Sequence, residues 1–216
     1  MSTEKLDTEI RKEQIAQATL EVIAAKGLAK VSVAAVAKRV GVVPSALYRH
    51  FKGKEEVLDA AMEMILGRLQ ENVDAVRAEQ GTPLDHLKRL LERHIRMIRK
   101  NRGIPQILLS QDFYAYRPDR RRRVYDGIQA YLARVAGLIR EAQRAGEAGP
   151  ELDTDTVSVM FLGLIQPPAI LWHMSNGTFD VTRQAQRAWP LFLKVIQDGA
   201  ASPPGKAAKG REGERK

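Results

Sequence analysis

Cysteine is absent from the 216-residue sequence. The chain therefore has no disulfide, no thiol nucleophile and no cysteine metal ligand, which suits a reducing compartment. The opening segment MSTEKLDTEIRKEQ contains no apolar run of the kind found in signal peptides. The most apolar stretch, residues 157–172, is interrupted by Pro167 and Pro168. These features predict a soluble, cytoplasmic protein with no membrane partner.

Sequence signals for catalysis and for metal binding are also missing. The four histidines lie too far apart for a recognisable metal site: His50, His86, His94 and His173. Ser110, Asp112 and His94 could be combined into a catalytic triad, but no nucleophile elbow or glycine-rich oxyanion motif accompanies them. We therefore expect no enzymatic activity, no metal and no cofactor. His94 falls on an apolar helical stripe, which favours a core histidine over a polar group that faces a pocket.

Acidic residues are absent from Val22 through Lys54, whereas seven lysines and arginines lie in the same stretch. Residues 55–82 reverse this balance and are rich in Asp and Glu. The whole chain has a net charge of +9 and an isoelectric point near 9.9, which favours a polyanionic partner but also serves solubility. The local asymmetry predicts an N-terminal module with its own electrostatic role.

Apolar residues recur at spacings of three and four along the chain, without the sustained alternation of strands. This pattern predicts an all-α protein of about nine helices, separated by Gly, Pro and capping residues. The expected helices cover approximately residues 8–26, 33–40, 44–50, 54–80, 83–98, 103–111, 118–146, 154–175 and 181–198. We expect a three-helix domain in residues 1–53, a larger helical domain in 54–198 and a disordered basic tail in 199–216.

Two short helices are expected on either side of a turn that contains Gly41, which is helix-turn-helix geometry. The second helix of such a module enters the major groove of DNA, where small side chains let the backbone approach the base edges. Three small residues begin this helix: Pro44, Ser45 and Ala46. Three residues with the reach for phosphate oxygens follow: Tyr48, Arg49 and His50. The alternative is a plain three-helix domain, which also needs a glycine turn and a basic solvated surface.

Several positions in residues 11–58 match a known pattern: Ile15-Ala16, Ala18, Gly27, Ser32-Val33, Val36-Ala37, Gly41-Val42, Leu47-Tyr48, His50-Phe51 and Lys54-Glu55. In these residues the sequence resembles the TetR-type bacterial transcriptional regulators. The resemblance implies a homodimer that binds palindromic double-stranded operator DNA and responds to a small organic effector. It implies phosphate contacts from Ser32, Tyr48, His50 and Lys54, and base-edge contacts from Pro44, Ser45, Ala46 and Arg49. Val43 and Gly53 depart from the pattern, because the family often has a helix-capping polar residue there.

The last two expected helices carry more large apolar residues than one domain core requires, which predicts a dimer interface built as a four-helix bundle. The expected interface residues are Phe161, Leu164, Ile165, Leu171, Trp189, Phe192 and Ile196. The alternative is that these residues close the core of the monomer. Pro167 and Pro168 are expected to kink or divide the helix over 154–175, at a cost of roughly 3 kcal/mol for each interior proline.

We expect the effector to fill a cavity lined by some of ten residues: Leu66, Leu69, Met97, Ile107, Leu108, Tyr125, Ile128, Phe161, Gln166 and Trp172. A packed core without a cavity is the alternative. The run Arg120 to Arg123 is expected to be solvated; an anion site or contacts with acidic residues of 54–80 are the alternatives. The sequence thus predicts an effector-responsive DNA-binding regulator, with a repressor favoured. The second hypothesis is a helical ligand-binding or membrane-surface protein whose basic module does not read DNA.

Overall fold

The computed structural model describes residues 3–115 and 117–198, with side chains from residue 11 onward in those ranges. The expected basic tail, 199–216, lies outside the described residues. Within the described part, the chain forms eleven α-helices and one short 3-10 helix, and no strand. The all-α prediction is confirmed.

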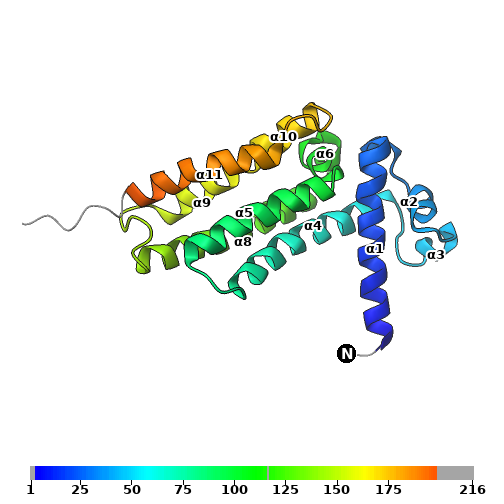
Figure 1. The fold of residues 1–216 in the computed structure, drawn as a ribbon. Coiled ribbons are helices and arrows are strands. Elements are labelled where there is room, and N and C mark those ends of the chain that lie inside the picture. Colours follow the sequence, from blue (N-terminus) through cyan, green and yellow to red (C-terminus); the bar gives the residue numbers. More distant parts are fainter. Residues whose placement is uncertain (1–2, 116, 199–216) are drawn as a thin grey trace, which may run out of the picture.

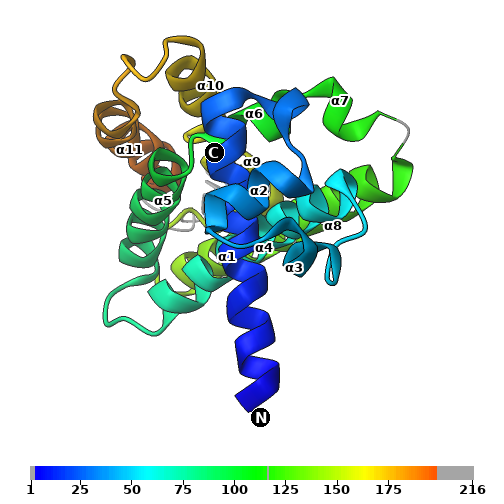
Figure 2. The same cartoon turned by 90° about the vertical axis from the view of Figure 1, so that its right-hand side faces the viewer.

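The first four elements form a compact unit at one end of the molecule (Figures 1 and 2). They are α1 (Thr3–Lys26), the 3-10 helix η1 (Leu28–Lys30), α2 (Val33–Val40) and α3 (Pro44–Tyr48). Figure 1 shows α1 crossing the start of α4, with α2 and α3 on the side of α1 that faces away from the other helices. The expected three-helix arrangement is therefore present, and its apolar anchors Leu47 and Phe51 are buried.

The remaining helices pack into a larger bundle in which α4, α5, α8 and α11 are the long helices (Figure 1). Their bounds are α4 (Lys54–Arg77), α5 (Pro83–Lys100), α6 (Gly103–Leu109), α7 (Gln111–Tyr114), α8 (Pro118–Arg144), α9 (Thr154–Gly163), α10 (Gln166–Met174) and α11 (Val181–Asp198). Capping residues in the sequence determine where several of these helices begin. Thr82 and Asp85 form a reciprocal capping box on α5, and Asp153 accepts the Thr156 N–H at 2.8 Å on α9.

Two features raise the number of helices above the nine expected. A short extra helix, α7, begins after Ser110, whose Oγ accepts the Phe113 N–H at 3.3 Å. The expected helix over 154–175 is divided into α9 and α10 between Gly163 and Gln166. Pro167 and Pro168 lie in the first turn of α10, where helix N–H groups have no intrahelical partner. The expected division of this helix is confirmed, and because both prolines lie in the first turn of α10, the cost of an interior proline does not apply.

The division also bears on the most apolar part of the chain. Thr154–Met174 has the length and the mean hydropathy, 1.4, of a membrane span. However, α9 and α10 contain 10 and 9 residues, so each helix is only about 15 Å long, half the thickness of a bilayer core. Phe161, Ile165 and Trp172 of this stretch are buried in a core that extends from α1 to α11.

Candidate DNA-binding surface and effector cavity

The helix-turn-helix is fixed by local signals that the sequence carries. Ser32 Oγ accepts the Ala35 N–H at 3.1 Å and caps α2. Gly41 ends α2 with φ of 84°, a left-handed conformation that favours glycine. Pro44 then occupies the first turn of α3. These three residues set the turn between the two short helices.

All eight predicted DNA-contact residues reach the surface, at least in part. Six are exposed and two, Ala46 and Lys54, are half-buried; the exposed ones are Ser32, Pro44, Ser45, Tyr48, Arg49 and His50. Four cations on this surface form no ion pair with any described residue: Lys38, Arg49, Lys52 and Lys54. Cations that are not engaged in local ion pairs are available for phosphate binding. Direct contacts from these residues to DNA stay a prediction.

The recognition helix is shorter than expected, because α3 ends at Tyr48 rather than near His50. Arg49 follows with helical dihedral angles, and the N–H groups of His50 and Phe51 both donate to Leu47 O at 2.9 Å. Val43 and Gly53 provide no side-chain cap to α3 or α4. The basic residues Arg49 and His50 are thus presented from a turn at the end of the helix.

A partly enclosed cavity of about 270 Å³ lies in the larger bundle, between α4, α5, α6, α8, α9 and α10. Six of the ten predicted effector residues line it: Leu66, Leu69, Met97, Leu108, Ile128 and Gln166. The other four do not. Ile107, Phe161 and Trp172 are buried in the core, and Tyr125 is 60% exposed on the outer side of α8. Tyr125 follows the cavity residue Val124 by one position, which is about 100° around the helix, and therefore faces away from the cavity.

His94 and Tyr131 are polar groups in this otherwise largely apolar lining. His94 Nδ1 lies 3.1 Å from the Tyr131 hydroxyl oxygen, and the two rings meet edge to face with centroids 5.5 Å apart. Burial lowers the pKa of His94 to about 4, so the imidazole is neutral at pH 7. Burial also raises the pKa of Tyr131. Sequence periodicity places both residues on inward-facing stripes but gives no indication that they pair.

The cavity helix α6 also lies against α1 of the N-terminal unit. Gly103, the first residue of α6, approaches the Leu20 backbone so closely that a Cβ atom there would be 2.5 Å from Leu20 O. Next to it, Gln17 Nε2 donates to Asn101 Oδ1 at 3.0 Å. The following residues of α6, Ile104 and Pro105, line the cavity. One wall of the cavity is therefore in direct contact with α1.

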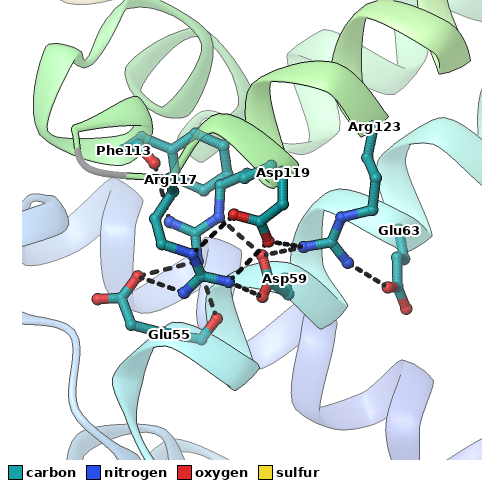
Figure 3. A network of polar contacts seen from close by, with 8 residues as sticks. Glu55, Asp59, Glu63, Phe113, Arg117, Asp119 and Arg123 are labelled. Atoms are coloured by element: carbon teal, nitrogen blue, oxygen red, sulfur yellow. Dashed lines mark hydrogen bonds and ion pairs between the residues drawn. The ribbon is translucent and has the colours of Figure 1, made fainter.

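A second link joins α8 to the beginning of α4. It is an arginine–carboxylate cluster made of Arg117, Arg120, Arg123, Glu55, Asp59 and Glu63. Figure 3 shows Arg117, just before α8, and Arg123 of α8 pointing toward Asp59, with Glu55 and Glu63 on either side. Their Nη2 atoms lie 3.3 and 3.1 Å from the Asp59 carboxylate. The acids occupy successive turns of α4, which starts directly after the helix-turn-helix.

Arg120 is the buried member of the arginine–carboxylate cluster, with 1% of its surface exposed. Its Nη1 donates to Phe113 O at 2.8 Å, its Nη2 lies 2.9 Å from Glu55 Oε2, and its guanidinium stacks over the Phe113 ring at 4.5 Å. One alternative for the arginine run is contact with acidic residues of α4, and Arg120 makes such contacts. Arg121 and Arg122 are exposed. The Arg117 hydrogen bond holds the pKa of Asp119 at about 2, below its usual range.

The predicted dimer residues are mostly turned inward. Phe161, Ile165, Trp189, Phe192 and Ile196 are buried in the chain's own core, where Phe161 and Phe192 rings pack 5.9 Å apart. Leu164 is half-buried and Leu171 is 48% exposed. Besides Leu171, the large apolar residues exposed on α9, α10 and α11 are Val159, Met160, Met174, Leu191 and Val195. We call these six residues the apolar face.

The described residues contain no group of three or more His, Asp or Glu side chains placed to hold a metal ion. The polar groups of the cavity have no arrangement of nucleophile and base beyond the His94–Tyr131 hydrogen bond. The geometry thus combines a basic helix-turn-helix surface, a cavity and two contacts between them.

Comparison with known proteins gives relatives along most of the chain. The fatty acid metabolism regulator protein of Bacillus subtilis is 23% identical over 185 residues, covering 86% of this chain and 95% of the relative. The nucleoid occlusion factor SlmA of Vibrio cholerae is 25% identical over 189 residues, covering 87% and 96%.

Solved structures share the fold. The fatty acid degradation regulator FadR of Bacillus halodurans aligns with a TM-score of 0.72 and 24% identity, covering 84% of this chain and 94% of that chain. The FadR of Bacillus subtilis, solved in complex with stearoyl-CoA, aligns with a TM-score of 0.71 and 23% identity, covering 85% and 98%.

Two family models match complementary parts of the sequence. The model of bacterial regulatory proteins of the tetR family matches residues 15–61, which hold the helix-turn-helix. The model of the tetracyclin repressor-like C-terminal domain matches residues 80–196, more than half of the chain. This chain belongs to the TetR family of bacterial regulatory proteins.

Proposed function

We propose that the protein is a homodimeric transcriptional repressor that releases a palindromic operator when an apolar ligand fills the cavity. Residues 1–53 would bind DNA, and residues 54–198 would bind the effector and form the dimer. The observation that carries the proposal is the position of the cavity. Its walls include α4, which begins directly after the helix-turn-helix, and α6, whose Gly103 contacts α1. The protein would act in the cytoplasm, where operator DNA is accessible.

The size and lining of the cavity favour a medium-length acyl chain. A cavity of about 150 Å³ holds benzene, so 270 Å³ accommodates roughly eleven non-hydrogen atoms. The lining contains no charged side chain, so an ionised group would have to stay outside. Beside the cavity, Tyr114 also borders a surface cleft with the exposed Arg121 and Arg122. This cleft would suit an anionic head group, as in an acyl-CoA.

The comparisons support the same class of ligand. One relative is named a fatty acid metabolism regulator, and a structural neighbour was solved with stearoyl-CoA. A stearoyl chain exceeds the roughly eleven atoms that the cavity accommodates in this conformation. We therefore propose a shorter chain, of about ten carbons, for this protein. To change the ratio of DNA-binding to released protein from 99:1 to 1:99, such a ligand must bind the released state more favourably by about 5.5 kcal/mol.

The mechanism follows from the two contacts described above. A chain that enters between α4 and α6 would push α6 away from α8 and carry α1 with it through Gly103 and Asn101. The arginine–carboxylate cluster would carry a movement of α8 to the first turns of α4. Both displacements would change the separation of the two recognition helices in a dimer, and operator half-sites tolerate only spacings set by the DNA helical repeat.

The test begins with genomic DNA fragments selected for binding to the purified protein. Their affinity is measured by fluorescence anisotropy at several salt concentrations, with and without decanoic acid or decanoyl-CoA. We expect affinity to fall steeply with salt, as phosphate contacts require, and to fall further with saturating ligand. A protein that selects no fragment would support the second hypothesis, in which the basic module is no DNA reader. If neither ligand changes the affinity for the selected fragments, the proposed effector class is contradicted.

A further inference from the structure

The buried His94–Tyr131 pair places one unsatisfied hydrogen-bonding atom at the apolar cavity. Tyr131 occupies Nδ1 of the imidazole, at 3.1 Å. The other ring nitrogen, Nε2, has no hydrogen-bond partner among the described residues. The described residues contain no fully enclosed side-chain nitrogen or oxygen atom that lacks a hydrogen-bond partner. Nε2 is therefore not fully enclosed. Because His94 lines the cavity and is otherwise buried, Nε2 keeps its accessible surface there.

We propose that His94 Nε2 recognises an uncharged oxygen, a keto or hydroxyl group, carried on the apolar chain of the ligand. This inference rests on the proposed function, because it specifies the chemistry of the effector in the same cavity. It assigns to His94 a role in ligand specificity, and to Tyr131 a role in positioning the imidazole. The effector would then be an oxygenated medium-length chain rather than a plain saturated one.

The chemistry of the pair supports an uncharged oxygen. A neutral imidazole has one donor and one acceptor nitrogen, so the bond with Tyr131 leaves Nε2 as a single donor or acceptor. If the Tyr131 hydroxyl donates to Nδ1, then Nε2–H donates, and a keto or hydroxyl oxygen can accept. In the other tautomer a ligand hydroxyl can donate to Nε2. A hydroxyl group therefore fits both states, and the low pKa of the buried ring keeps it neutral at pH 7.

Plain hydrocarbon is disfavoured at this position. A saturated chain that fills the cavity removes water from Nε2 and leaves the nitrogen without a partner, which costs free energy. The penalty is smaller for two other polar residues of the lining, Gln166 and Tyr114. Gln166 is exposed and Tyr114 is half-buried, so both can remain hydrated. His94 is the lining residue whose hydrogen-bonding need a ligand must meet.

The test compares binding of decanoic acid with a series of its mono-oxo and monohydroxy derivatives, substituted at successive chain positions, by titration calorimetry on the full chain. We expect at least one derivative to bind the wild-type protein about tenfold more tightly than decanoic acid, which corresponds to about 1.4 kcal/mol. In His94→Phe this preference should vanish while decanoic acid binding is kept or improved. His94→Gln, which retains a polar head, should keep part of the preference.

Each outcome decides the proposal. Derivatives that all bind more weakly than decanoic acid would overturn it while leaving the acyl effector intact, and so would a preference that persists in His94→Phe. If no compound binds, the inference and the proposed effector class fail together. Should His94→Phe fail to fold, as judged by thermal melting, the wild-type series and His94→Gln still decide.

Discussion

Arg120 on α8 donates from Nε to Oδ1 of Asp59 on α4 at 2.7 Å, although the two residues are 61 positions apart in the sequence. Arg120 precedes the cavity residue Val124 by four positions. Asp59 follows Lys54, where α4 begins, by five positions. A helix that borders the cavity is thereby fastened to the helix that leaves the DNA-binding unit. Arg120 is thus a buried connection between α8 and α4, whereas Glu55, Glu63 and Arg123 of the cluster are exposed.

Replacement of Arg120 tests this link. We expect Arg120→Ala to lower the free energy of unfolding by about 3 kcal/mol, because it leaves a cavity and removes a buried partner of Asp59. It should also weaken the effect of ligand on operator affinity. Urea denaturation measures the first effect and anisotropy the second. Arg144, exposed in the last turn of α8, is the control, and Arg144→Ala should change stability by no more than about 0.5 kcal/mol. Equal effects of the two variants would show that Arg120 links nothing.

The close approach of α6 to α1 depends on the missing side chain of Gly103. In Gly103→Ala the new Cβ would be 2.5 Å from Leu20 O, so a backbone must move. We expect a loss of about 1–3 kcal/mol in the free energy of unfolding. Gly67 in the middle of α4 is the control, since a Cβ there would meet nothing within 4 Å. Gly67→Ala should stabilise the protein by about 0.5–1 kcal/mol. A neutral Gly103→Ala would mean that α6 is not pressed against α1.

His94 should make stability depend on pH in a defined window. Its pKa is lowered by burial from 6.5 to about 4, so between these values the unfolded chain binds a proton that the folded chain does not. The free energy of unfolding should therefore fall as pH decreases from 6.5 to 4, by up to about 3 kcal/mol, and this contribution should level off below. Urea denaturation at successive pH values measures it. The curve of His94→Phe should lack this contribution, and parallel curves for both proteins would refute it.

The apolar face predicts where a second copy binds. We expect the double variant Leu191→Glu and Val195→Glu to be a folded monomer, because both residues are exposed and charge there disfavours an apolar interface. Tyr125→Glu, at an exposed residue of α8, should remain a dimer. Light scattering and thermal melting distinguish these outcomes. Phe192→Glu should instead unfold the larger bundle, since Phe192 is 4% exposed. A dimeric double variant would place the interface on another surface.

Local signals were sufficient to predict the helix-turn-helix from sequence. Ser32, Gly41 and Pro44 each act within a few residues, through a cap, a left-handed turn and a helix start. Six residues of the cavity lining were also predictable, because apolar periodicity identifies the inner face of a helix.

Features that depend on distant parts of the chain were not predictable. In α11 the buried stripe contains Trp189 and Phe192, while Leu191 and Val195 form a second apolar stripe on the outside. Periodicity cannot tell which stripe faces the chain's own core and which is left exposed. The sequence favours a solvated Arg120 because the acids that pair with it lie about sixty positions earlier in the chain.

Ligand control of the distance between the two recognition units of a dimer can be measured without knowing the operator. Because the chain has no cysteine, Lys38→Cys on the exposed side of α2 gives one spin-label site in each subunit. Electron–electron double resonance then reports the distance between the two labels in the dimer. We expect saturating decanoyl-CoA, or the best oxygenated decanoic acid, to shift this distance distribution away from the one that suits half-sites about 34–36 Å apart. An unchanged distribution at full occupancy, shown by calorimetry on the same sample, would contradict this expectation.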